Sequence, residues 1–227
     1  MTQKSKIAVI GLGNIGTAVA INLVKGSRSV IIADRSIEKA NALSQKLGNL
    51  SHPLSIPAAI DEADIIVFAI WFDAIKELFN TYAKELQGKI IVDPSNPIAP
   101  DEKGGFKKII DKDQSAGQIL SSLLPKNTKL AKALGTLGAA SLANAAFQQP
   151  EKAVEFYATD DKSIDDQIEE LKQWCKKIVV LDPMATTSTS AKLRLVQMGT
   201  TKKVSAAFSK KLVKSIEEVL AELKGEG

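Results

Sequence analysis

A short apolar run followed by three closely spaced glycines constrains the fold of this chain more than any other sequence feature. The glycines, in the order GxGxxG, are Gly11, Gly13 and Gly16. The run before them, residues 7–10, predicts a strand buried on both faces, and the apolar run after them predicts a helix. A second predicted strand, residues 29–33, is followed by Asp34. In a βαβ unit that binds a dinucleotide, an acidic residue is expected about 20 residues after the glycines, and Asp34 is close to that position. The amino terminus is therefore predicted to form such a unit, of the Rossmann type.

Each glycine has its own role in this prediction. Gly11 allows the tight turn out of the strand, and Gly13 lets a pyrophosphate approach the backbone without a Cβ in the way. Gly16 lets the helix pack closely on the strand. The amino end of that helix offers unpaired N–H groups and about half a positive charge to the phosphates.

Composition narrows the function classes. The chain has 227 residues, with 44% apolar and 25% charged side chains, as expected of a globular protein. Its formal net charge is +4, and it has only seven Phe, two Tyr and two Trp. The basic and aromatic surface of a nucleic-acid-binding protein is therefore not predicted, and anionic small molecules are the expected partners.

The single cysteine and the single histidine argue against metal and nucleophilic chemistry. Cys175 is interpreted as a small buried residue rather than a catalytic thiol, and His52 as a solvated loop residue rather than a general base. No metal site is predicted. With no signal peptide and no apolar run of about 18–20 residues, we expect a cytoplasmic chain without membrane contact.

Strands and helices alternate over the first 145 residues, which predicts an α/β fold with a doubly wound parallel sheet. The Asp73 side chain is expected to cap one of the helices. Pro94, Pro97 and Pro100 are expected to impose an irregular loop, with residues 101–108 polar and flexible. The predicted helices are 36–47, 73–86, 115–124 and 139–147, and the further predicted strands are 65–70, 89–93 and 129–134.

Loops that follow parallel strands meet at one edge of a sheet, where ligands of such folds bind. Five segments are therefore expected to converge: residues 11–16, 34–35, 70–71, 95–97 and 135–138.

The pattern changes after residue 145. Residues 1–145 are predicted to form the Rossmann domain, and residues 146–227 a small α+β carboxy-terminal domain. The latter has predicted strands at 154–158 and 178–181 and helices at 163–175, 188–198 and 204–224. The last helix has an apolar stripe beside many lysines, which favours packing within the protein or on a second subunit over a membrane surface. We expect a homodimer.

The chain resembles the deazaflavin-dependent NADP oxidoreductases, the family of NADPH:coenzyme F-420 reductase and its bacterial dinucleotide-binding relatives. The resemblance runs over roughly residues 5–200, and no single motif is decisive. The matching segments, in order, are Gly11-Leu-Gly-Asn-Ile-Gly16, Asp34-Arg-Ser-Ile-Glu-Lys39, Ile70-Trp-Phe-Asp-Ala-Ile75, Asn96-Pro97, residues 115–125 and Lys132-Ala-Leu-Gly-Thr-Leu137.

The resemblance implies that a Rossmann domain carries NADP and that hydride passes directly to a deazaflavin, a flavin or another planar acceptor. No acid–base residue is implied to be indispensable, so no catalytic side chain is predicted. Arg35 is implied to meet the adenosine 2′-phosphate, with Lys39 close by. The other implied cofactor-binding residues are Gly11, Leu12, Gly13, Asn14, Ile15, Gly16, Asp34, Ile70, Trp71, Asn96, Pro97, Thr136, Leu137 and Ala139.

Several alternatives stay open on the sequence. Asp34 favours NAD, because a carboxylate binds a free 2′-hydroxyl, whereas Arg35 favours NADP, which is preferred here. Lys39 is either a phosphate ligand or a solvated residue. Trp71, with Phe72, is either core or a wall of the nicotinamide pocket. Gly135 and Gly138 stand where the archaeal enzymes have bulkier residues, which weakens the case for coenzyme F-420.

Three functions fit these features to different degrees. The first is an NADP(H)-dependent oxidoreductase, and the second a non-catalytic NAD(P)H-binding redox sensor or partner module. The third is a short relative of the β-hydroxyacid or pyrroline-carboxylate dehydrogenases, disfavoured because the predicted strands after residue 150 do not fit their all-helical domain.

Overall fold

The computed structural model describes residues 4–111, 113–135, 138–144, 146–147, 157–171 and 180–181. The chain divides into two compact units, residues 1–190 and 191–227, and the second lies wholly outside the described residues.

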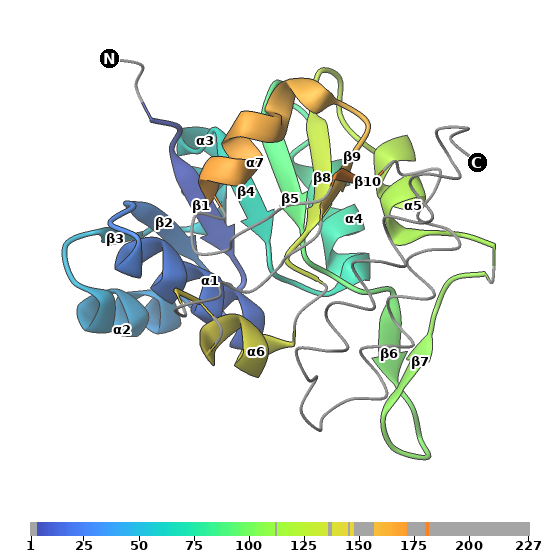
Figure 1. The fold of residues 1–227 in the computed structure, drawn as a ribbon, viewed down its shortest axis with the longest axis horizontal. Helices are drawn as coiled ribbons and strands as arrows, with labels where there is room; N and C mark the ends of the chain where they lie inside the picture. The colour runs from blue at the N-terminus through green and yellow to red at the C-terminus, as the bar shows by residue number, and fades with distance from the viewer. Residues whose placement is uncertain are drawn as a thin grey trace, which may run out of the picture. The chain divides into compact units, whose positions relative to one another are not determined.

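A single eight-stranded sheet forms the centre of the first unit (Figure 1). Its strand order is β10-β9-β8-β5-β4-β1-β2-β3, and every neighbouring pair is parallel except β8 and β9. The order reverses between β1 and β4, as in a doubly wound dinucleotide-binding sheet, which confirms the predicted fold class. The strands are β1 (Ile7–Ile10), β2 (Val30–Ala33), β3 (Ser51–Pro53), β4 (Ile65–Phe68), β5 (Ile90–Asp93), β8 (Lys129–Ala133), β9 (Tyr157–Thr159) and β10 (Val180–Leu181).

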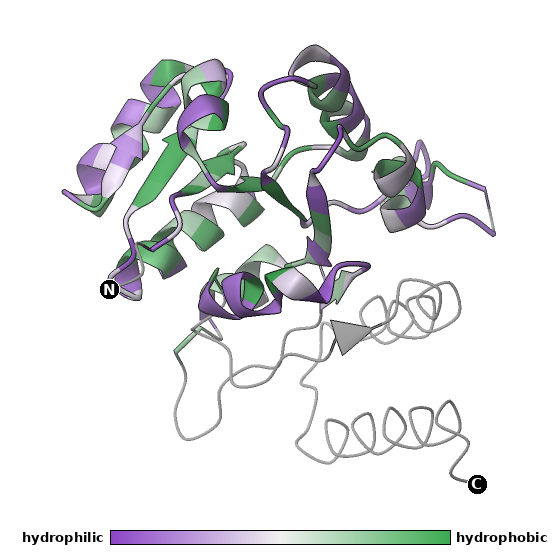
Figure 2. Ribbon diagram, turned by 90° about the horizontal axis from the view of Figure 1, so that it is seen from above, coloured by the Kyte–Doolittle hydropathy of each residue, from purple (hydrophilic) through white to green (hydrophobic). Residues whose placement is uncertain are grey.

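Helices cover both faces of the sheet, so the core has two layers. In β1, Ile7 and Val9 pack into one apolar cluster, and Ala8 and Ile10 into the other, as the period of two in a strand requires. Figure 2 shows the hydrophobic strands between helices with mixed surfaces. The first cluster is covered by α1 (Asn14–Lys25), α2 (Ile37–Leu47), α6 (Ala139–Asn144), the short 3-10 helix η1 (Lys162–Ile164) and α7 (Asp165–Leu171). The second is covered by α3 (Ile56–Glu62), α4 (Phe72–Thr81) and α5 (Ala116–Ser122).

Serine caps begin the helices that the sequence predicted at 36 and 115. The Ser36 hydroxyl accepts a hydrogen bond from the Lys39 amide at 3.2 Å, which satisfies one of the free donors at the start of α2. Ser115 and Gln118 form a reciprocal capping box at the start of α5. The local sequence therefore fixes where both helices begin.

Two expectations about the loops are wrong. Asp73 does not cap α4, because Trp71 occupies the capping position and the Asp73 carboxylate pairs with Lys76 at 2.6 Å within the first turn. The segment from Pro94 to residue 108 is not irregular throughout, because β6 (Ile98–Pro100) and β7 (Phe106–Lys108) form an antiparallel hairpin.

His52 is exposed as expected, but it lies in the edge strand β3 rather than in a loop. Helix α3, capped by Ser55, was not predicted.

The chain after α6 extends the same sheet. β9 pairs with β8, and α7 follows it, so parts of the predicted strand 154–158 and helix 163–175 are observed. The proposed domain boundary after residue 145 stays a prediction. Cys175 and the predicted helices 188–198 and 204–224 lie outside the described residues. No helix in the described part of the chain is long and apolar enough to cross a membrane.

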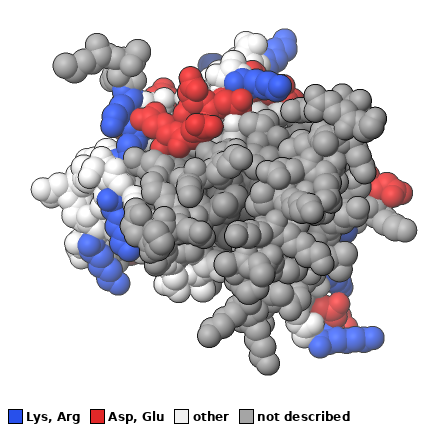
Figure 3. All heavy atoms as spheres, in the orientation of Figure 1, with Lys and Arg blue, Asp and Glu red and all other residues white. Residues whose placement is uncertain are grey.

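A buried arginine ties α7 to the amino-terminal segment. The Arg28 guanidinium, in a residue that is 4% exposed, pairs with Glu170 at 2.7 Å and donates to the Ser5 carbonyl at 2.9 Å. Acidic side chains gather over the region of α7 in Figure 3. Removing this cation therefore leaves a carboxylate without its partner inside an acidic surface.

We expect Arg28→Met to lower the free energy of unfolding by about 2 kcal/mol, less than for a fully buried pair because Glu170 is partly exposed. Urea unfolding measures the change. Lys6→Met is the control, since its pair with Glu62 is 3.8 Å long and exposed on both sides, and it should cost at most about 0.5 kcal/mol. Equal effects of the two variants would contradict the expectation.

Candidate functional site

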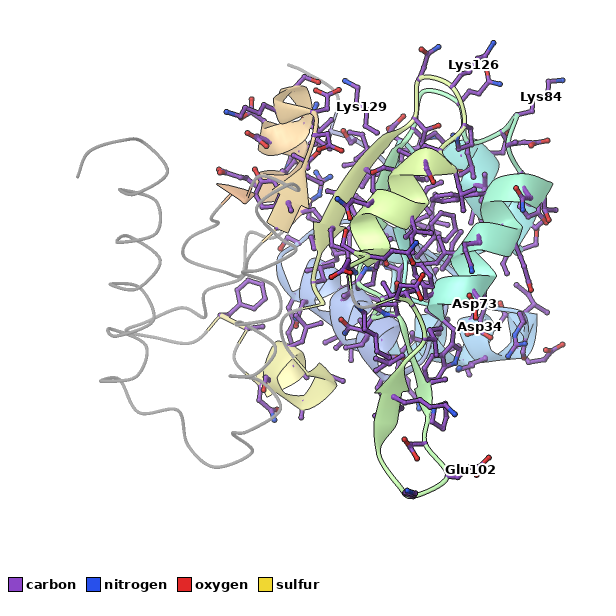
Figure 4. All side chains as sticks on the ribbon, turned by 90° about the vertical axis from the view of Figure 1, so that its right-hand side faces the viewer. Asp34, Asp73, Lys84, Glu102, Lys126 and Lys129 are labelled. Carbon is purple, nitrogen blue, oxygen red and sulfur yellow. The ribbon has the colours of Figure 1, made fainter. Side chains whose placement is uncertain are left out.

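The candidate site lies where the strand order reverses, at the carboxyl ends of β1 and β4. Loops after these two strands lead to helices on opposite faces of the sheet, and ligands of doubly wound sheets bind at such a reversal point. In Figure 1 these strands run toward the edge at which α1 begins. Figure 4 shows Asp34 toward this edge, and Lys84, Lys126 and Lys129 toward the opposite one.

The first and third glycines make the turn after β1 possible. Gly11 has φ +94°, and a Cβ on it would lie 2.4 Å from Cγ2 of Ile70 and 2.6 Å from the carbonyl oxygen of Ala69. A Cβ on Gly16 would lie 1.8 Å from the Gly11 carbonyl oxygen. The glycines therefore let the turn press against both the loop after β4 and the first turn of α1.

Gly13 differs from its two neighbours. A Cβ on it would meet no heavy atom within 4 Å, so nothing in the described protein fills the space above it. Gly13 also occupies the capping position of α1, where no side chain makes a capping hydrogen bond and no acidic residue lies in the first turn. The positive end of a 12-residue helix thus faces open space, which suits an anion.

Asp34, which follows β2, is hydrogen-bonded to the glycine turn after β1. Its Oδ2 accepts the Leu12 amide at 2.7 Å and lies 3.3 Å from Nζ of Lys39, and its Oδ1 accepts the Ser36 amide at 3.3 Å. Burial raises the pKa of Asp34, but the hydrogen bonds from Leu12 and Ser36 and the charge of Lys39 outweigh it, so the pKa lies below its usual value. The carboxylate is therefore ionised at neutral pH, with its charge compensated inside the chain.

Arg35 lies beside this arrangement and is exposed. Among the described residues, none makes an ion pair or a hydrogen bond with its guanidinium. Lys39 is half exposed and pairs with Asp34, so it is not simply solvated. Asp34 and Lys39 neutralise each other, whereas the Arg35 charge faces solvent.

The loop after β4 presents an exposed aromatic side chain. Trp71 is 59% exposed, whereas Phe72 is 1% exposed and packs under α4. The core interpretation therefore holds for Phe72 and fails for Trp71. Ile70, between them and Ala69, contacts the glycine turn.

The loops after β5 and β8 contact each other. Nδ2 of Asn96 lies 3.5 Å from the Gly135 carbonyl oxygen, to which it donates, and a Cβ on Gly135 would lie 2.7 Å from the Pro94 carbonyl oxygen. Pro97 is buried, and Ala139 begins α6. Thr136 and Leu137 lie outside the described residues.

The structure thus brings together three predicted pairs of segments: the glycine turn with Ile70, the glycine turn with Asp34, and Asn96 with Gly135. It also shows an ion pair that the sequence analysis missed, Asp93 with Lys132. The signal in the sequence was an acidic residue at the end of a predicted apolar strand. In the described ranges, no three His, Cys, Asp or Glu side chains lie close enough to hold a metal ion.

Comparisons with known proteins agree with this geometry. Residues 6–97 match the family described as NADP oxidoreductase coenzyme F420-dependent. The F420-dependent NADP reductase of Methanothermobacter marburgensis is 26% identical over 147 residues, which are 60% of this chain and 66% of that protein. The glutamyl-tRNA reductase of Caldivirga maquilingensis is 39% identical over 97 residues, 41% of this chain and 23% of that protein. The chain therefore spans less than two thirds of either relative.

A solved structure has the same fold over most of both chains. The hypothetical protein SMa0349 from Sinorhizobium meliloti superposes with a TM-score of 0.70 at 26% identity, covering 80% of this chain and 86% of the other.

Proposed function

We propose that the chain is an NADP(H)-dependent oxidoreductase, because its residues 6–97 match the family described as NADP oxidoreductase coenzyme F420-dependent. It transfers hydride between the nicotinamide and a deazaflavin, a flavin or another planar acceptor. The observation that carries this proposal is the open amino terminus of α1 above Gly13, beside the unpaired Arg35.

The residues present fit the diphosphate of such a nucleotide. The empty space above Gly13 admits a phosphate, and the free amides of the first turn of α1 can donate to its oxygens. Asp34 holds the amide of Leu12, which fixes the turn before the nucleotide arrives. Leu12, Asn14 and Ile15 complete the proposed diphosphate side.

Arg35 supports NADP over NAD. A guanidinium can pair with a 2′-phosphate through two parallel hydrogen bonds, and Arg35 has no competing ion pair among the described residues. Asp34 repels a phosphate less than a free carboxylate would, because Lys39 and two amides already bind it. Lys39 adds a second positive charge close to the same position.

The chemistry of the reaction belongs to the cofactor, since a reduced nicotinamide supplies the hydride when it is bound. The chain binds and orients the ring and shields it from water. Ile70, Trp71, Asn96, Pro97, Thr136, Leu137 and Ala139 are the residues proposed around the ring. No acid–base side chain is assigned.

We also propose a cytoplasmic homodimer. The apolar stripe that the sequence places along residues 204–223 is the proposed subunit contact. A monomeric mass by light scattering at micromolar concentration would refute the dimer.

Calorimetric titration with NADPH, NADP and NADH tests the cofactor, and a screen of coenzyme F-420, flavin, quinone and ferric acceptors at fixed NADPH tests the reaction. We expect saturable NADPH binding and turnover with at least one acceptor. Absence of binding to every nucleotide would overturn the proposal.

A nucleotide-binding sensor without catalysis is the second candidate, because a fold alone does not establish chemistry and no acid–base side chain is assigned to the site. Binding without turnover, together with a nucleotide-dependent change in affinity for a protein partner, would favour it.

Arg35→Gln is expected to weaken NADPH binding about 10- to 100-fold and to leave NADH binding unchanged, because a charge-assisted phosphate contact contributes about 1.5–3 kcal/mol. Parallel calorimetric titrations measure both constants. Lys46→Gln removes an exposed positive charge from the last turn of α2 and should change neither. A proportional loss of NADPH and NADH affinity in Arg35→Gln would contradict the role assigned to Arg35.

Trp71 should report on the nicotinamide, because its indole is exposed beside the glycine turn. We expect NADPH to quench the tryptophan fluorescence of the wild-type protein and to quench that of Trp71→Phe much less. Equal quenching in the two proteins would place Trp71 away from the ring.

A further inference from the structure

A buried ion pair joins the loops on one half of the site. Asp93 and Lys132 lie opposite each other at the ends of the neighbouring parallel strands β5 and β8. The Lys132 ammonium is 3.0 Å from Oδ2 of Asp93, in a residue that is fully buried, and the lysine side chain is 26% exposed.

The same ammonium also holds the backbone that follows β5. It donates to the Asp93 carbonyl at 3.1 Å and to the Ser95 carbonyl. The Asp93 carboxylate also contacts the turn after β5, because its Oδ1 accepts a hydrogen bond from the Ser95 amide at 2.7 Å. Lys132 and Asp93 thus fix both the amide and the carbonyl of Ser95.

The turn held in this way supports the loop after β8. Asn96 donates to the Gly135 carbonyl, and the absence of a Cβ on Gly135 lets that loop pass close to the Pro94 carbonyl and to Nζ of Lys132. The two loops therefore form one unit fixed to β8 by a charged side chain.

This unit and Asp34 lie on opposite sides of the point where the strand order reverses, because β5 and β8 follow β4 in the sheet whereas β2 follows β1. A dinucleotide bound across the reversal point of a doubly wound sheet places its adenosine half at the end of β2 and its other half toward β4 and β5. The loops after β5 and β8 then face the nicotinamide half.

We propose that Lys132, paired with Asp93, is a positioning residue that holds the loops after β5 and β8 against the nicotinamide half of the nucleotide. The inference rests on the proposed function, since it assumes an NADP(H) site. Lys132 acts through the turn at Ser95 and Asn96.

The test compares Lys132→Met with Lys129→Met. Lys129 begins the same strand at the opposite edge of the sheet, where it pairs with Asp161 at 3.1 Å (Figure 4), so it controls for loss of a lysine from β8. Because Lys132→Met leaves Asp93 buried without its partner, the double variant Lys132→Met with Asp93→Asn is measured as well. Asparagine removes the charge and keeps an oxygen for the Ser95 amide.

Calorimetry then measures NADPH against adenosine 2′,5′-bisphosphate, which lacks the nicotinamide half. We expect Lys132→Met and the double variant to bind NADPH about tenfold more weakly, or about 1.4 kcal/mol, and the bisphosphate as tightly as wild type. Lys129→Met should bind both ligands normally. A double variant that folds and binds NADPH within about twofold of wild type, or loses both ligands equally, overturns the inference.

Hydrogen exchange separates this result from failure of the proposed function. The amides of Ser95 and Asn96, the residues between Pro94 and Pro97, should exchange faster in Lys132→Met than in Lys129→Met, with or without nucleotide. If wild type binds neither ligand, the proposed function fails, and equal exchange in the two variants overturns the role of Lys132 in holding the turn.

Discussion

A Gly13→Ala variant is expected to fold nearly as stably as the wild-type protein and to bind NADPH at least about a hundredfold more weakly, a loss of about 2.7 kcal/mol. In the free protein the added methyl group meets no heavy atom within 4 Å, so folding loses only about 1 kcal/mol or less from the poorer cap. In the complex the methyl group occupies the space through which the diphosphate approaches the backbone.

Thermal unfolding without ligand and calorimetry with NADPH measure the two effects separately. Gly117→Ala, in α5, provides the matched control, because its added Cβ also meets open space but lies away from the glycine turn in sequence. It should bind NADPH normally. Unchanged NADPH affinity in Gly13→Ala would show that the open space is not the diphosphate site.

Gly16→Ala is expected to fail in the opposite way, by losing at least about 3 kcal/mol of folding free energy. The new Cβ would lie 1.8 Å from the carbonyl oxygen of Gly11 and 3.0 Å from the Ala69 side chain. Because the obstructing atom belongs to the backbone, no flexible side chain can move aside, and α1 itself must move away from the turn. An alanine in an unobstructed helix would instead stabilise by about 1 kcal/mol.

Urea unfolding of Gly16→Ala and Gly117→Ala measures this contrast directly. Both substitutions place alanine inside a helix, and only the first meets a neighbour within 3 Å. Gly117→Ala should be as stable as the wild-type protein or slightly more stable. Similar stabilities of the two variants would contradict the packing role assigned to Gly16.

The βαβ unit was predictable because each of its parts leaves a local signal. The short, uniformly apolar run at residues 7–10 predicts a strand buried on both faces. The glycine spacing predicts the turn that follows it, and Ser36 predicts the start of the next helix. The strand order then follows from general topology rules. These signals do not depend on contacts distant in sequence.

The elements that were missed have weak local signals. Strands β6 and β7 contain two polar residues and a proline among six, and their pairing depends on a turn through Gly104 and Gly105 at positive φ. The edge strand β3 is three residues long and contains His52 and Pro53. Proline and short polar runs predict a loop when only the local sequence is considered. These segments are strands because each pairs with a neighbouring strand.

The convergence of these loops at one edge of the sheet was predictable, and their contacts only partly so. The rule that loops after parallel strands share an edge placed Asp34, Ile70 and Asn96 correctly relative to their partners. That Asp34 binds the Leu12 amide required the conformation of the turn, and the Asp93–Lys132 pair required the register of β5 with β8. Neither can be inferred from residue order.

The reversed direction of β9 has a consequence for how the chain returns to the sheet. Tyr157, its first residue, lies opposite Ala133 at the end of β8, and Thr159, its last, lies opposite Ala131. The chain therefore enters this strand at the edge where β1 and β4 end and leaves it at the opposite edge. A reporter peptide grafted after Thr159 would therefore lie at the edge of the sheet opposite the glycine turn, whereas one grafted just before Tyr157 would lie at the same edge as that turn.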